Sequence, residues 1–437
     1  MSISTMILQS PPQATDSNIT IPGSKSYTNR ALILAALSRT NVILSHCSLS
    51  DDSRALLDAL EKCGVLVSVS NDTIEIDSSN LAPYRGGIEV GAAGTTMRFL
   101  TSFFSILPGC DVVLSGSKRM HERPIGDLVE ALVSLGADIS YEGSQGCPPL
   151  RIRGKKLCGG EVSLSASISS QYLTSLLLVG GEFDKGLTIS LDGPPVSRSY
   201  IAMTEEVLRD FKREFRVKSD SVYHVSPREL SKQVHAYTCE SDASGASYFF
   251  GAAALSPGGR VRINYFSLNS LQGDAAFPRL LERMGATVTE GKEHGVPLVE
   301  VVGPNELIAI EADMSLMPDT AQTLAVIASQ AKGTTRLTGL HTLRHKETDR
   351  IHALVTEFSR LGIKTNAGDD WLEVEGTSDL VLAPIETYDD HRMAMSFSLL
   401  AFRHSGIHIK DSQVVTKSFP TFWELFGTLG VLIQEKP

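Results

Sequence analysis

The sequence has few cysteines and no long apolar run. Its 437 residues include six cysteines, which are dispersed and form no C-x-x-C pair. Neither a zinc site nor a disulfide framework is therefore predicted, and the thiols are expected to be buried or incidental. No apolar run reaches the roughly 18 residues of a membrane span, and the first residues lack the basic and apolar segments of a secretory signal. We expect a cytoplasmic protein that contacts no membrane.

Basic residues are in the minority as well. Forty lysines and arginines stand against 50 aspartates and glutamates, which gives a net charge of −10 with neutral histidine. This balance argues against nucleic acid as a bulk electrostatic partner. Low-complexity segments and long linkers are also missing, whereas 42% of the residues are hydrophobic. The length predicts about two or three domains, each with a sizeable core.

What the sequence does contain is one pattern repeated six times. A short polar or glycine-rich segment leads into a strongly apolar helical stretch, and an amphipathic stretch follows that ends in a Leu-Gly-Ala-like step into a strand. One step, at Phe215-Arg216-Val217, lacks the glycine. The middle residues of the steps are 72, 80, 69, 77 and 68 residues apart, at positions 64, 136, 216, 285, 362 and 430. This period suits a small α/β subdomain, and we infer six copies grouped as three and three.

The first helical stretches are apolar on nearly every face, which predicts buried helices. The segments before them carry cations and hydroxyls. In the first copy, Pro-Gly-Ser-Lys-Ser leads into a helix on which Ser26 and Arg30 share a face. Because the exposed backbone N–H groups of a helix start favour an anion, we expect a small anionic ligand.

Nine blocks occur in order along essentially the whole chain. They are PGSKSYTNRALILAAL, GAAGTTMRFL, RMHERPIGDLVEAL, SSQYLTSLLL, DASGASYFF, QGDAAFPRLLERMGA, LRHKETDRI, YDDHRMAM and KSFPTFWEL. In this order they resemble the EPSP synthases, the 3-phosphoshikimate 1-carboxyvinyltransferase family. The resemblance implies an addition–elimination reaction that transfers the enolpyruvyl group of phosphoenolpyruvate to the 5-hydroxyl of shikimate 3-phosphate and releases phosphate. This reaction belongs to the shikimate pathway, which leads to chorismate and the aromatic amino acids.

The resemblance also implies the fold and the partners. It implies two α/β domains, each made of three βαβαββ copies packed around buried parallel helices as an inside-out α/β barrel. The N-terminal domain would span residues 22–240, and the C-terminal domain would combine residues 1–21 with 241–437, with the active cleft between the two. The family acts as a monomer and uses no cofactor or metal, because phosphoenolpyruvate already carries the activated group.

The two substrates together bring two phosphates and two carboxylates, and arginine and lysine side chains suit such anions. By resemblance, shikimate 3-phosphate would be bound by Lys25, Ser26, Arg30, Ser169, Ser170, Gln171, Ser197, Asp319 and Lys346. Phosphoenolpyruvate would be bound by Lys25, Gly94, Arg123, Gln171, Arg350, Arg392 and Lys417.

Two protons must move during the addition step of this reaction. The 5-hydroxyl loses a proton as it attacks, and the methylene carbon of phosphoenolpyruvate gains one. Pro318 places Asp319 at a helix start, and we expect Asp319 to accept the hydroxyl proton. Either Glu347 or Lys25 is expected to protonate the methylene carbon.

Other residues of the nine blocks are expected outside the site or near its edge. Arg98 lies one turn into its helix, and Asp242 and Asp274 are expected to cap helices or to contact the hinge. Gly94 matches a family glycine that leaves room for phosphoenolpyruvate, which predicts sensitivity to glyphosate. The sequence departs from the usual family residues at three positions: Ala92, Phe99 and Thr342.

Three other functions share part of the pattern. The sister transferase that acts on UDP-N-acetylglucosamine normally has a reactive cysteine in the loop at residues 117–126, where this sequence reads SKRMHERPIG. A nucleotide-binding P-loop needs a glycine directly before the lysine and another five residues earlier, and both are missing around Lys25. A non-catalytic phosphometabolite sensor is the third, although an anion binder gains nothing from carboxylates such as Asp319 and Glu347.

Overall fold

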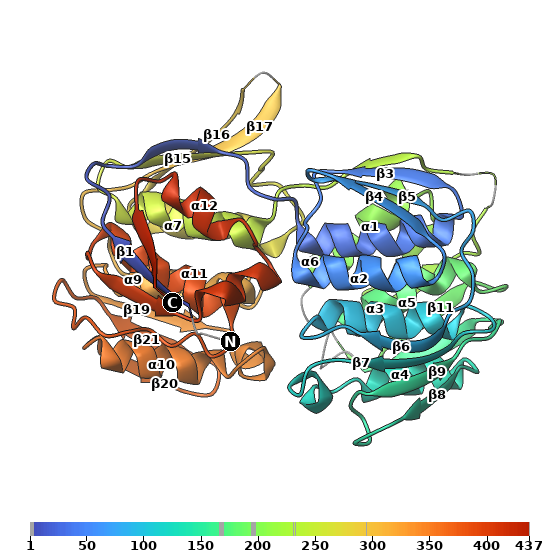
Figure 1. Cartoon of the computed structure of the whole chain (residues 1–437). Coiled ribbons are helices and arrows are strands. Elements are labelled where there is room, and N and C mark those ends of the chain that lie inside the picture. The colour runs from blue at the N-terminus through green and yellow to red at the C-terminus, as the bar shows by residue number, and fades with distance from the viewer. Residues whose placement is uncertain are drawn as a thin grey trace. The chain divides into compact units, whose positions relative to one another are not determined.

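The computed structural model describes residues 4–165, 170–193, 198–229, 231, 233–293 and 295–436. Two residues predicted to bind substrate, Ser169 and Ser197, lie outside the described residues. The chain folds as two compact units (Figure 1). The N-terminal unit is Gly23–Glu240, and the C-terminal unit combines Met1–Pro22 with Ser241–Pro437.

The N-terminal unit alternates helices and short strands. Its helices are α1 Lys25–Ser38, α2 Asp51–Lys62, α3 Gly94–Ser105, η1 Met120–Glu122, α4 Gly126–Ser134, α5 Ser170–Val179, η2 Gly180–Glu182 and α6 Arg198–Asp210. Its strands are β3 Asn41–Ser45, β4 Leu66–Ser70, β5 Thr73–Asp77, β6 Arg85–Glu89, β7 Asp111–Ser115, β8 Asp138–Tyr141, β9 Leu150–Arg153, β10 Gly160–Leu164, β11 Leu187–Leu191, β12 Phe215–Ser219, β13 Val222–Val225 and β14 Ala236–Thr238.

The C-terminal unit has the same kind of element order. Its helices are α7 Ala243–Leu255, η3 Gly273–Ala276, α8 Phe277–Arg283, η4 Pro318–Thr320, α9 Ala321–Ala328, η5 His341–His345, α10 Arg350–Arg360, α11 His391–Ser398, η6 Leu399–Phe402, η7 Ser412–Lys417 and α12 Phe422–Gly427. Its strands are β1 Thr5–Gln9, β2 Asp16–Ile19, β15 Arg260–Asn264, β16 Thr287–Glu293, β17 Val296–Val302, β18 Glu311–Asp313, β19 Thr334–Thr338, β20 Thr365–Ala367, β21 Leu372–Glu375, β22 Ile407–Lys410 and β23 Leu432–Lys436.

The sheets repeat one pairing pattern. In β6-β7-β9-β8 the first two strands are parallel, and β9 is antiparallel to both of its neighbours. The same pattern recurs in β10-β11-β13-β12, β14-β3-β5-β4, β2-β15-β17-β16 and β18-β19-β21-β20. The sixth sheet is β22-β1-β23, in which a single parallel bridge from Ile385 to Ile409 stands in for the first strand. Six copies of a βαβαββ unit are therefore present, as the spacing predicts.

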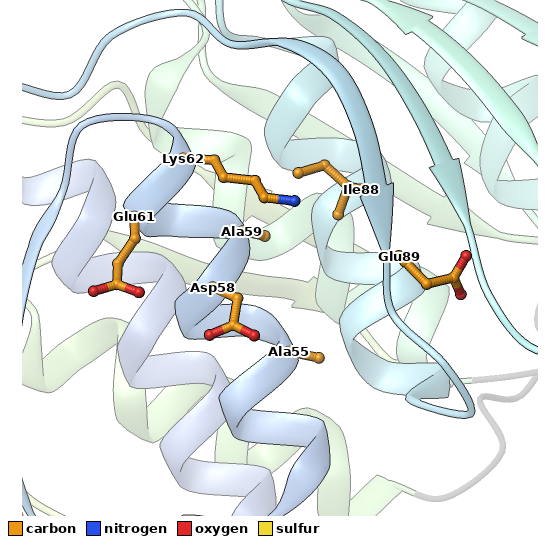
Figure 2. A pocket seen from close by; sticks show the side chains of 7 residues that line it. All are labelled: Ala55, Asp58, Ala59, Glu61, Lys62, Ile88 and Glu89. Atoms are coloured by element: carbon orange, nitrogen blue, oxygen red, sulfur yellow. The ribbon is translucent and has the colours of Figure 1, made fainter.

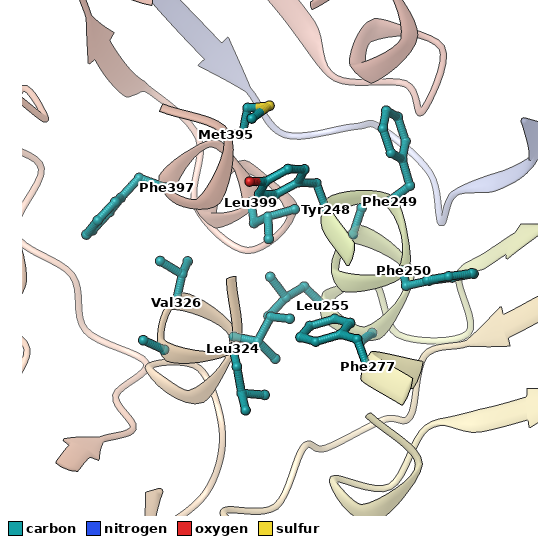
Figure 3. Close-up of a cluster of buried hydrophobic side chains, with 14 of the residues drawn as sticks. Tyr248, Phe249, Phe250, Leu255, Phe277, Leu324, Val326, Met395, Phe397 and Leu399 are labelled. Carbon is teal, nitrogen blue, oxygen red and sulfur yellow. The ribbon is translucent and has the colours of Figure 1, made fainter. Parts of the chain in front are cut away.

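The first helix of each copy is buried nearly all round. Helices α1, α3 and α5 contact one another in the N-terminal unit, and α9 contacts α7 and α11 in the C-terminal unit. Figure 3 shows side chains of these last three helices in one buried cluster. Small residues permit the close approach, since a Cβ added to Gly251 of α7 would lie 2.9 Å from Ile327 and 3.0 Å from Leu399. The prediction of buried helices is confirmed.

The third of the six Leu-Gly-Ala-like steps is not at Arg216, as predicted, but at Lys212. The amide of Lys212 donates to the Arg209 carbonyl, as the amide of Gly136 does to Val133 at the end of α4. Lys212 also adopts the left-handed conformation, with a φ of 56°. The sequence pattern does not reveal this helix end, because a lysine occupies a position where glycine is favoured.

Most of the cysteines are buried, as predicted. The buried ones are Cys47, Cys63, Cys110 and Cys239, whereas Cys147 is half-buried and Cys158 is exposed. Across the described ranges, no helix is both long enough and apolar enough to cross a membrane.

Three glycines occupy equivalent places in three copies, directly after the last strand. A Cβ would lie 2.0 Å from the Leu107 carbonyl oxygen at Gly154, 2.1 Å from that of Ala253 at Gly303 and 1.6 Å from that of Ala331 at Gly376. None of the three has a positive φ. The close approach of strand and helix, rather than backbone freedom, therefore requires glycine.

We expect Gly376→Ala to destabilise the C-terminal unit by about 2 kcal/mol, because the methyl group meets backbone that cannot rotate away. This lowers the midpoint of thermal unfolding by roughly 5 °C, which calorimetry can measure. The control is Gly291→Ala, where no heavy atom of the described chain, apart from the residue itself and its two neighbours in sequence, lies within 4 Å of the added Cβ. Equal midpoints for the two variants would contradict the steric explanation.

Candidate active site

Seven charged side chains form one network in the C-terminal unit, which we call the Arg350 cluster. Pro318 begins η4 and so places the following residue at the turn before α9. The carboxylate of Asp390 caps α11 by accepting a hydrogen bond from the Arg392 amide at 2.9 Å. The members are Asp319, Lys346, Glu347, Arg350, Asp390, Arg392 and Lys417.

Arg350 is the centre of the cluster, and its side chain is only 1% exposed. Its Nε donates to Asp390 Oδ2 at 2.7 Å, its Nη1 to Asp319 Oδ1 at 3.2 Å and its Nη2 to Glu347 Oε2 at 2.9 Å. Burial alone lowers the pKa of Arg350, but the three carboxylates outweigh burial and raise it. The guanidinium therefore stays charged.

Asp319 is held by three cations. Its Oδ1 lies 3.2 Å from Arg350 and 3.4 Å from Lys346, and its Oδ2 lies 2.9 Å from Arg392. Burial raises the pKa of Asp319, but Arg392, Lys346 and Arg350 together lower it well below the usual range. The carboxylate is thus ionised in this arrangement and is a weak base.

Glu347 links the network to the end of η7. Its Oε1 accepts a hydrogen bond from Lys417 Nζ at 2.5 Å, and its Oε2 accepts one from Arg350. The structure thus brings together all six residues of the C-terminal unit that the sequence analysis places in the site. Asp390 was missed, and the available signal was its place in the polar segment before an apolar helical stretch, where an aspartate is a typical helix cap.

A further buried carboxyl lies at η3. Asp274 is 6% exposed and accepts a hydrogen bond from Ser244 Oγ. Burial, reinforced by the charge of Asp319 and opposed by Arg392, raises the pKa of Asp274 to about 7. Asp242 caps α7 by accepting from the Gly245 amide at 2.7 Å, as predicted.

The N-terminal unit holds Arg30 by uncharged oxygens. Arg30 is 3% exposed, and it donates to Thr204 Oγ1 at 2.9 Å and to the Ser26 carbonyl at 2.7 Å. Burial lowers its pKa to about 10. Lys25 Nζ lies 3.2 Å from Asp52 Oδ2, and the Lys25 side chain is 20% exposed. The desolvated guanidinium of Arg30 attracts anions strongly.

Gly94 lies against two arginines. A Cβ on Gly94 would lie 2.7 Å from an Nη1 atom of Arg123 and 2.7 Å from that of Arg98. Arg98 donates to the Gly94 carbonyl at 2.8 Å, so this arginine, which the sequence analysis leaves out of the site, belongs to its surroundings. Gln171 Nε2 donates to Thr95 Oγ1 at 3.1 Å, which brings the start of α5 to the same place.

The three departures from the family pattern have different environments. Ala92 is exposed, whereas Phe99 is 1% exposed and its ring centroid lies 5.9 Å from the Arg30 guanidinium carbon. Thr342 is half-buried, and among the described residues its Oγ1 has no hydrogen-bond partner.

A surface hollow beside α2 and β6 does not match the predicted site. Figure 2 shows its lining by Ala55, Asp58, Ala59, Glu61, Lys62, Ile88 and Glu89. Lys62, its one cation, already donates to the Gly87 carbonyl at 3.3 Å. In the part of the chain that the structure describes, no group of three or more histidine, cysteine, aspartate or glutamate side chains is arranged to hold a metal ion.

Known proteins are similar to this chain in fold and in sequence over nearly its whole length. A solved structure of EPSP synthase from Acinetobacter baumannii covers 100% of both chains with a TM-score of 0.83 at 27% identity. The 3-phosphoshikimate 1-carboxyvinyltransferase of Marinomonas sp. (strain MWYL1) is 40% identical over 424 residues, which cover 96% of this chain and 98% of the relative. That of Trichormus variabilis is 38% identical over 94% of this chain and 96% of the relative.

The structural match defines the class, a two-domain α/β transferase fold. The model of the family EPSP synthase (3-phosphoshikimate 1-carboxyvinyltransferase) matches residues 9–426, and the chain belongs to this family. The predictions of family, fold class and enolpyruvyl transfer in the shikimate pathway are confirmed. The family match also argues against the sister enzyme that acts on UDP-N-acetylglucosamine.

The raised pKa of Asp274 predicts a pH-dependent stability. The folded protein holds this proton up to about pH 7, whereas the unfolded chain releases it near pH 3.8. The contribution of Asp274 to stability is therefore greatest below the unfolded value and is lost as the pH rises through the folded value. Asp274→Asn removes the titration, and the amide oxygen can still accept from Ser244.

We expect the stability of Asp274→Asn, relative to the wild type, to improve by roughly 2 kcal/mol between pH 5 and pH 8. Urea unfolding at both pH values measures the difference, with the exposed Asp379→Asn as control. A relative stability that does not change with pH, or that falls, would show that Asp274 does not titrate in this range.

Proposed function

We propose that the residues predicted from the sequence carry out this enolpyruvyl transfer, an addition–elimination at the 5-hydroxyl of shikimate 3-phosphate. The observation that carries this proposal is the Arg350 cluster, in which four cations are held by carboxylates on separate segments. Of these carboxylates, Asp319 is the predicted acceptor of the hydroxyl proton, and Glu347 is one of the two candidates, with Lys25, for protonating the methylene carbon.

The cations of the cluster suit four substrate anions. Arginine pairs with phosphate and carboxylate through two parallel hydrogen bonds, and lysine adds a mobile point charge. Of the predicted residues, the N-terminal unit supplies Lys25, Ser26, Arg30, Gly94, Arg123, Ser169, Ser170, Gln171 and Ser197, and the C-terminal unit supplies Asp319, Lys346, Glu347, Arg350, Arg392 and Lys417.

Substrate anions compete with Asp319 for its cations. Each phosphate or carboxylate that binds Arg392 or Lys346 weakens the contacts that keep the pKa of Asp319 low. Asp319 then becomes a stronger base when the acceptor hydroxyl arrives, and it takes the hydroxyl proton as oxygen bonds to C2 of phosphoenolpyruvate.

The methylene carbon receives its proton from Lys25 or Glu347. Lys25 carries a proton as an ammonium group and lies against Asp52. Glu347 must first gain a proton, and the contacts with Lys417 and Arg350 oppose that step. Loss of the phosphate group from C2, together with a proton from the methyl carbon, then forms the enol ether, and the fixed cations stabilise the charge on the leaving phosphate.

The experiment that tests the proposal is phosphate release from phosphoenolpyruvate with and without shikimate 3-phosphate, followed by mass analysis of the product. We expect release only with the acceptor, together with an enolpyruvyl adduct. Asp319→Asn is expected to lower kcat by about 100-fold or more, and Asp379→Asn to leave it unchanged. Near-normal turnover in Asp319→Asn would contradict its role as base. Binding of both substrates without release would favour a non-catalytic sensor.

Gly94 gives a second test, on phosphoenolpyruvate binding. In Gly94→Ala the methyl group displaces Arg123 and Arg98, so we expect a KM for phosphoenolpyruvate about tenfold higher. Glyphosate should inhibit the wild type in competition with phosphoenolpyruvate, and the variant much less. The control is Gly87→Ala, because no heavy atom of the described chain lies within 4 Å of its added Cβ. Unchanged KM and inhibition in Gly94→Ala would contradict the placement of Gly94 in the site.

We further propose that residues 22–240 and residues 1–21 with 241–437 act as the two domains of a monomeric cytoplasmic enzyme, and that their residues share one active cleft. Each compact unit has its own hydrophobic core and carries part of the predicted residues, which supports this division. A dimer mass from light scattering would contradict the monomer.

A further inference from the structure

The segment that leads into α11 has an unusual backbone. Tyr388 and Asp389 have φ values of 56° and 54°, in the left-handed region that residues other than glycine rarely adopt. Two such residues in succession persist only where the surroundings hold them. They directly precede Asp390, which is fully buried and binds Arg350. The conformation of this segment therefore sets the position of a carboxylate at the centre of the cluster.

One face of α10 holds both ends of the segment. Arg350 and Glu357 are seven residues apart, about two helical turns, so their side chains lie on the same face. Arg350 binds Asp390, and Glu357 Oε1 accepts a hydrogen bond from Tyr388 Oη at 2.7 Å. Glu357 Oε2 also accepts from the Glu386 amide at 3.2 Å.

Arg360 supplies the charge that the buried Glu357 needs. Its Nη1 lies 2.9 and 2.8 Å from the two oxygens of Glu357, whose side chain is 1% exposed. The other nitrogen of Arg360 donates to the Pro384 carbonyl at 2.7 Å. Because Arg360 already compensates the carboxylate, the Tyr388 hydroxyl is not needed for charge balance. Its hydrogen bond selects one conformation of the segment.

We propose that Glu357 and Tyr388 are positioning residues for phosphoenolpyruvate recognition. They hold Asp390 where its Oδ2 meets Arg350 and its Oδ1 meets the Arg392 amide. Without the Tyr388 hydrogen bond, the left-handed pair relaxes and Asp390 shifts, and Arg392, two residues later, shifts with it. This inference rests on the proposed function of Arg350 and Arg392 in binding phosphoenolpyruvate.

The test is Tyr388→Phe, which removes one hydroxyl and keeps the ring. We expect the KM for phosphoenolpyruvate to rise about tenfold. The KM for shikimate 3-phosphate, kcat and the unfolding temperature should stay close to wild type, because Arg360 still pairs with Glu357. Backbone amides of residues 389–393 should exchange hydrogen faster than in the wild type, with exchange in the other helices unchanged.

Two further variants are compared with Tyr388→Phe. Tyr223→Phe, in the N-terminal unit, also loses one phenol hydrogen bond, of 3.2 Å to the Asp220 carbonyl, and should leave both KM values unchanged. Glu357→Gln keeps an oxygen for Tyr388 but loses the charge that Arg360 binds. It should lower the unfolding temperature and should raise the KM for phosphoenolpyruvate less than Tyr388→Phe does.

Two results in Tyr388→Phe would overturn the inference. One is unchanged exchange at residues 389–393. The other is a proportional rise in both KM values together with a fall in the unfolding temperature, which indicates a general structural role. A wild type without turnover would instead refute the proposed function, and the hydrogen-exchange comparison would still decide whether Tyr388 holds the segment.

Discussion

The burial of the Arg350 guanidinium is the constraint on which the candidate site depends. A charged group that is 1% exposed must be matched by opposite charge, and three carboxylates from three segments provide it. This requirement fixes the start of α10 against η4 and against the cap of α11. Loss of one carboxylate would remove one of the three partners of Arg350 and so weaken the packing of these segments.

The same charge balance explains how a cation site can be built into a folded protein. The carboxylates hold the arginines and lysines in place and lower the cost of bringing them together. In the proposed function, substrate anions take over these contacts without a large rearrangement, which is the kind of preorganisation that electrostatic catalysis requires. In the N-terminal unit, the buried guanidinium of Arg30 is instead stabilised by hydrogen bonds to neutral oxygens of Thr204 and Ser26.

Much of the fold could be predicted from the sequence, because the repeat leaves local signals: apolar helices and a glycine at five of the six helix ends. The helix end at Lys212 was not predicted, because a residue other than glycine adopts the left-handed conformation there. The site residues came from resemblance to a family, and their mutual contacts could not be predicted. Asp390 and Glu357 depend on tertiary packing between segments that are distant in sequence, whereas the contact of Arg98 with the Gly94 carbonyl lies within one turn of α3 and depends on the conformation of the Arg98 side chain.

In the proposed mechanism, substrate anions release Asp319 from its cations and so make it a base. Infrared difference spectroscopy can follow protonation of this carboxyl, with its band assigned by its loss in Asp319→Asn. The titration is made with the protein alone and then with saturating shikimate 3-phosphate and inorganic phosphate. We expect a higher pKa for Asp319 when both anions are bound. An equal or lower pKa would contradict this mechanism.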